Sequence, residues 1–150
     1  MTNWLTDGRT ALLTALQNDA TLSAAVRKWF DWGPGLRQRF DVLPAYCPIV
    51  SVVAAELDED QIANAATSWP QDVEIGIATD GQDLEPCEEL VAAALDVVQA
   101  ENMTCLGLVS AGVSGLNVVS IRWHAEVDEK DARVRWFCAL VVRIHWMRRT

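Results

Sequence analysis

The sequence predicts an α+β two-layer sandwich, with a mostly antiparallel sheet, a long C-terminal hairpin and helices packed on one face. The main observations are strand-like alternation in the last 35 residues and a helical period over residues 83–98. The length of 150 residues makes a single domain, residues 1–150, the default. With 51% hydrophobic residues and seven Trp, the chain can build a core, and general disorder is excluded.

The N-terminal segment has the apolar spacing of a helix. Four leucines lie close to one helical face: Leu5, Leu12, Leu13 and Leu16. Gly8 disfavours helix, so we expect the helix proper to begin near Arg9. Asp19 is placed to cap a second, shorter helix. Residues 31–48 are dense in Gly and Pro and predict a long connection, a kind of segment that is often functional.

The middle of the chain predicts two strands and a helix. Residues 49–55 form a short β-branched run, and residues 56–66 form an acidic connection. Alternating apolar residues at positions 73, 75 and 77 then indicate a half-buried strand. A helix is expected to begin around residues 83–86, with Pro86 in its first turn.

The last third of the chain predicts a long antiparallel hairpin. Residues 116–127 and 132–147 are the strongest strand signals, and the polar residues 128–131 between them indicate a turn. Trp123 and Trp136 are expected to fill the core. Residues 103–115 are weakly patterned and are interpreted as one short strand with a Gly-rich loop.

The titratable residues do not predict an enzyme. His124 and His145 both fall on the hairpin strands, where surface or sheet-edge positions are the simplest interpretation. A two-histidine metal site across the hairpin lacks a third ligand. The cysteines have no CxxC spacing, so we interpret all four as buried free thiols: Cys47, Cys87, Cys105 and Cys138. We therefore predict no catalytic residues, no cofactor and no metal.

Charge is distributed very unevenly along the chain, which carries a formal charge of −9. The 82 residues between Arg39 and Arg122 contain 14 acids and no Lys or Arg, whereas both flanking segments are net positive. Two interpretations remain open: simple solubility, or self-assembly in which acidic and basic faces of neighbouring copies meet. Specific nucleic-acid binding is disfavoured, because no basic stripe with interleaved aromatic residues occurs. We also expect no membrane span and no signal peptide.

In the order of these segments and in their residue patterns, the chain resembles tail terminator (tail completion) proteins of long-tailed bacteriophages. The resemblance covers roughly residues 8–147. It rests on LLTALQNDATLSAAV, a Trp/Gly/Pro loop, PIVSVVAAE, DVEIGIATDG, and the hairpin IRWHAEV…DARVRWFCALVVRIHW. It implies a non-enzymatic virion protein, made in the host cytoplasm, that forms a hexameric ring at the tail–neck junction. Such a ring caps the tail tube, ends its polymerisation, and joins it to a head-side connector or neck protein.

The resemblance also implies where functional residues lie. An acidic lumen would repel the phosphates of DNA that passes through without specific binding, so the acidic connection is expected to face the lumen or a neighbour. The candidate interface or lumen residues are Glu56, Asp58, Glu59, Asp60, Trp32, Arg37, Arg39, Arg133 and Arg135. Two alternatives remain: another neck protein of the same virion (head–tail joining or head closure), or a cytosolic small-molecule-binding or thiol-dependent domain.

Overall fold

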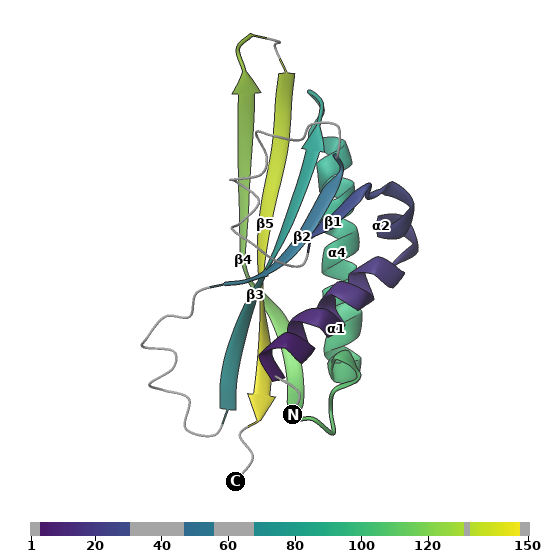
Figure 1. Cartoon of the computed structure of the whole chain (residues 1–150), viewed down its shortest axis with the longest axis vertical. Helices are drawn as coiled ribbons and strands as arrows, with labels where there is room; N and C mark the ends of the chain where they lie inside the picture. The colour runs from purple at the N-terminus through teal and green to yellow at the C-terminus, as the bar shows by residue number, and fades with distance from the viewer. Residues whose placement is uncertain (1–3, 31–46, 56–67, 131–132, 148–150) are drawn as a thin grey trace.

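The computed structural model describes residues 4–30, 47–55, 68–130 and 133–147. The elements are α1 (Trp4–Asn18), α2 (Ala20–Ala25), β1 (Lys28–Phe30), β2 (Ile49–Ala54), β3 (Ser68–Asp80), α4 (Glu85–Thr104), a 3₁₀ turn (Cys105–Gly107), β4 (Val113–Asp128) and β5 (Arg133–Met147). The five strands form one sheet in the order β1-β2-β3-β5-β4, and helices α1 and α4 cover one of its faces (Figure 1). The predicted α+β class is confirmed. None of the described helices has the length and apolar character needed to span a membrane.

The long C-terminal hairpin forms as predicted and provides two of the sheet's five strands. β5 lies between β3 and β4 and is antiparallel to both. Only the β1–β2 pair is parallel. The order of strands leaves β4 as one edge of the sheet, and two irregularities interrupt its pairing with β5 near its start. β4 begins at Val113, three residues before the predicted start.

The main core lies between the sheet and the helices. The alternation of β5 places Cys138, Leu140, Val142, Ile144 and Trp146 on the helix-facing side, and all five are buried there. The opposite side of β5 buries Phe137 and Ala139 in a second, smaller cluster. Charged residues border this second cluster, so the outer face of the sheet is partly apolar and partly ionic, as the alternation predicted.

Helix α1 begins at Trp4 and runs through Gly8, so the predicted start near Arg9 is wrong. The reason is a tertiary contact that outweighs the low helix propensity of glycine. The side chain of Gln71 donates a hydrogen bond from Nε2 to the Leu5 carbonyl (2.6 Å) and accepts one from Trp146 Nε1 (2.9 Å). A Cβ at position 8 would lie 2.5 Å from Gln71 Oε1, so only glycine lets α1 approach the sheet this closely.

Helices α2 and α4 begin where the sequence indicated. The carboxylate of Asp19 accepts a hydrogen bond from the Leu22 amide (3.0 Å), which confirms the predicted cap. Pro86 stands in the first turn of α4, as expected from its fixed φ and missing N–H. Helix α4 then continues to Thr104, two residues into the segment that we expected to be strand and loop.

Two expectations about particular elements are wrong, and one strand was missed. Residues 103–115 hold no separate short strand: they contain the end of α4, the 3₁₀ turn and the start of β4. Strand β1 was not predicted, because its three residues are too few to show a period. Trp123 is 45% exposed rather than buried, since it lies on the edge strand where the helix layer does not cover it. Trp136 does pack against the main core.

Candidate assembly surfaces

The outer face of the sheet carries a buried ion pair between β3 and β5. Asp72 and Arg143 are opposed in the strand register, and the guanidinium donates from Nε (2.8 Å) and Nη2 (3.0 Å) to the two carboxylate oxygens. Asp72 is only 7% exposed. Hydrogen bonding to this carboxylate raises the pKa of Arg143 above its ordinary value. The pair satisfies two charges that burial would otherwise penalise, and its geometry is that of a fixed structural contact.

A second ionic group lies nearer the hairpin turn and contains two of the predicted interface residues. Arg133 Nη2 is 3.3 Å from one carboxylate oxygen of Asp80, and Arg135 Nε is 3.9 Å from the other. The Arg135 side chain is 12% accessible, whereas that of Arg133 is 51% accessible. Arg135 is therefore mainly a structural residue of the sheet, while Arg133 remains open to a partner.

The two histidines lie far apart along the hairpin. His124 pairs in register with Phe137, and His145 pairs with Gly115, so eight β5 residues, roughly 26 Å of strand, separate the two levels. His124 Nε2 is 3.7 Å from Glu126 Oε1, and His145 Nε2 is 2.6 Å from Asn117 Oδ1. Burial, the largest cause, lowers the pKa of His145. Across the described residues no group of three His, Cys, Asp or Glu side chains is suited to a metal ion.

The cysteines lie mostly in apolar surroundings. Cys47, Cys87 and Cys138 are buried and unbridged, as predicted, while Cys105 is half-buried. Burial raises the pKa of Cys87 to about 11 and that of Cys138 to about 12. Burial also raises the pKa of Cys47. A nucleophilic cysteine needs a lowered pKa, so these three thiols are poor candidates for catalysis.

These pKa shifts predict slow thiol chemistry and a loss of stability at alkaline pH. At pH 8 a thiol with a pKa of 11 is ionised only to about one part in a thousand, so native Cys87 and Cys138 should react very slowly with a disulfide reagent. The pKa of each thiol is higher in the folded protein than the unfolded value of 9.0, so folding favours the neutral thiols. The stability that this preference contributes is complete below pH 9 and is lost as pH rises toward 11–12. Urea unfolding between pH 7 and 10.5 measures how the free energy of unfolding depends on pH. In Cys138→Val this dependence should be weaker. Rapid labelling of both thiols in the native protein would contradict it.

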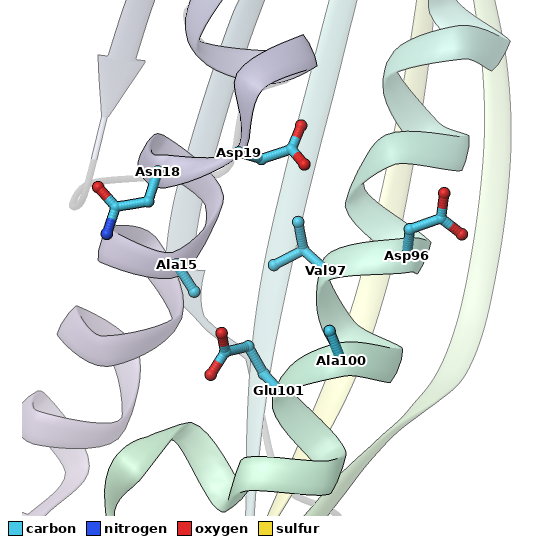
Figure 2. A pocket seen from close by; sticks show the side chains of 7 residues that line it. All are labelled: Ala15, Asn18, Asp19, Asp96, Val97, Ala100 and Glu101. Atoms are coloured by element: carbon cyan, nitrogen blue, oxygen red, sulfur yellow. The ribbon is translucent and has the colours of Figure 1, made fainter.

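A groove lies between the helices. It has a volume of about 310 Å³ and lies between α1, α2 and α4, lined by Ala15, Asn18, Asp19, Asp96, Val97, Ala100 and Glu101. Figure 2 shows Val97 and Glu101 extending from α4 toward α1, with Asp19 at the start of α2. Asp19 is already engaged as the α2 cap. The lining combines carboxylates with small apolar side chains and contains neither a nucleophile nor a basic group, so it offers no catalytic arrangement.

The exposed side of the first three turns of α4 is rich in acidic residues. Helix α4 contains no Lys, Arg or His, and its exposed residues include Glu85, Glu88, Glu89 and Asp96, with the small Ala92 between them. We call these five residues the acidic α4 surface. The helix dipole favours the glutamates of the first turn, but Asp96 lies too far along the helix for that explanation.

The edge strand β4 has an exposed apolar strip. Its residues Val119, Ile121, Trp123 and Val127 are 39%, 44%, 45% and 63% exposed. Across the ladder, Cys138 and Leu140 of β5 are fully buried beneath the helices, so the helices leave residues 119–127 of β4 uncovered, whereas Val113 and Leu116 near the start of the strand are buried in the main core. Arg122 lies between Ile121 and Trp123 in the strand, on the opposite face of the sheet, and is exposed. We call these five residues the β4 edge surface.

The structure describes only two of the nine predicted interface or lumen residues, Arg133 and Arg135. The other seven lie outside the described residues: Trp32, Arg37, Arg39, Glu56, Asp58, Glu59 and Asp60. Sequence reasoning missed the β4 edge surface, because the alternation of β4 matches a strand with one buried side. The exposure of these β4 residues depends on the position of β4 at the sheet edge and on the irregular pairing with β5. Neither feature can be predicted from the sequence of one strand.

The arrangement defines the class of protein only as an α+β protein with helices on one face of a mostly antiparallel sheet. No protein-family model matches the chain, and no curated protein does. Among solved structures, the chain is similar to a chain in the virion of a native gene transfer agent particle. The identity is 20% and the TM-score 0.56, over 93% of this chain and 94% of that one. A crystal structure of a protein from Akkermansia muciniphila matches at 13% identity and a TM-score of 0.41, over 98% of this chain and 76% of that one. The first similarity shows a shared fold.

Proposed function

We propose that this chain is a structural protein of a phage virion that forms a ring, hexameric as the resemblance implies, on the end of the tail tube. The ring ends tube polymerisation and provides the joint to the head-side connector. DNA passes through its lumen without specific binding. The fold match over nearly the whole chain to a component of a virion carries this proposal. The surface supports it in a second way, since exposed apolar residues on β4 are of the kind that a partner covers.

Another neck protein of the same virion is the nearest alternative. A head–tail joining or head-closure protein would also form a ring from a subunit of this size, and the fold does not separate the two. The order of assembly does. A tail terminator binds the tube before the connector, whereas a head-closure protein binds the connector first.

A cytosolic thiol-dependent or small-molecule-binding domain is the second alternative, and the structure disfavours its thiol version. Burial raises the pKa of three cysteines, which is the opposite of what a nucleophile requires. The small-molecule version would need a pocket with a few convergent polar groups in an apolar lining. The α1–α4 groove instead collects carboxylates on an open surface.

Light scattering and tube-assembly measurements test the proposal. Purified protein should form a closed ring in a salt-sensitive equilibrium with monomer, because charge-paired interfaces weaken as salt screens them. Added to polymerising tail tube protein of the same virus, it should arrest elongation and remain at one tube end in electron micrographs. A protein that stays a monomer at all concentrations and leaves tube length unchanged would contradict the proposal. Prior binding to the isolated connector would favour the other neck protein.

A further inference from the structure

We draw no further inference here: the strongest candidate, the exposed apolar strip of Val119, Ile121, Trp123 and Val127 on the edge strand β4, carries none because nothing in the structure shows what covers it.

Discussion

Replacement of Arg143 by Met should destabilise the folded subunit by about 3 kcal/mol. The substitution removes both hydrogen bonds to Asp72, which is 7% exposed and would remain as a buried carboxylate without its cation. Breaking a buried ion pair from one side typically costs about 3–5 kcal/mol, and we expect the lower end because the Arg143 side chain is 20% accessible. For a chain of this size the midpoint of thermal unfolding should fall by roughly 6–12 °C.

Two variants show whether this loss of stability comes from the unpaired carboxylate of Asp72. Arg122→Met makes the same change at an exposed arginine of the same hairpin and should alter stability by less than about 0.5 kcal/mol. The double variant Asp72→Leu/Arg143→Met removes both charges and should recover most of the loss, because a buried pair is often replaceable by apolar residues. If the double variant is as unstable as the single one, the cost lies in packing rather than in the unpaired charge.

Gly8→Val should separate helix α1 from the sheet. A Cβ at this position would lie 2.5 Å from Gln71 Oε1 and 3.1 Å from the Trp146 ring. Overpacking costs about 1–3 kcal/mol, and displacing Gln71 would leave the Trp146 N–H buried without an acceptor, at about 1–3 kcal/mol more. The gain in helix propensity is below about 1 kcal/mol, so the tertiary cost decides the sign.

Chemical unfolding and tryptophan fluorescence measure this prediction together. The Trp4 and Trp146 rings pack edge to face at 5.2 Å, so loosening α1 should change the emission spectrum as well as the unfolding midpoint. Thr10→Val introduces the same side chain at an exposed position of α1 and should be nearly neutral. A stabilised Gly8→Val variant would mean that α1 packs against the sheet differently from the geometry described above.

The sequence was sufficient for features with a local cause. The Asp19 cap, Pro86 in the first turn of α4 and the alternation of residues 133–147 each depend on a few neighbouring residues, and all three were predicted correctly. The extension of α1 through Gly8 was missed, because its cause is Gln71, 63 residues away in the chain. Trp123 was missed for a similar reason, since its exposure depends on the strand order rather than on its own strand.

The candidate surfaces were predictable only in part. The acidic interval between Arg39 and Arg122 left solubility and self-assembly both open, and the structure places five of its acids on α4. The structure assigned Arg135 to an internal ion pair, which residue type alone could not reveal. The prediction for Glu56, Asp58, Glu59 and Asp60 stays a prediction, since these residues lie outside the described part of the chain.

The position of β5 has a consequence for how the protein is made. β5 contains the last described residues of the chain, yet it lies between β3 and β4 and joins the two halves of the sheet. On a ribosome, β3 and β4 therefore emerge before the strand that pairs with both of them. Until residues 133–147 leave the exit tunnel, two long strands present unpaired backbone, the condition in which nascent chains associate wrongly. The sheet cannot close before β5 has been synthesised, so chaperone protection during translation would matter more here than for a fold in which each new strand pairs with the strand just before it.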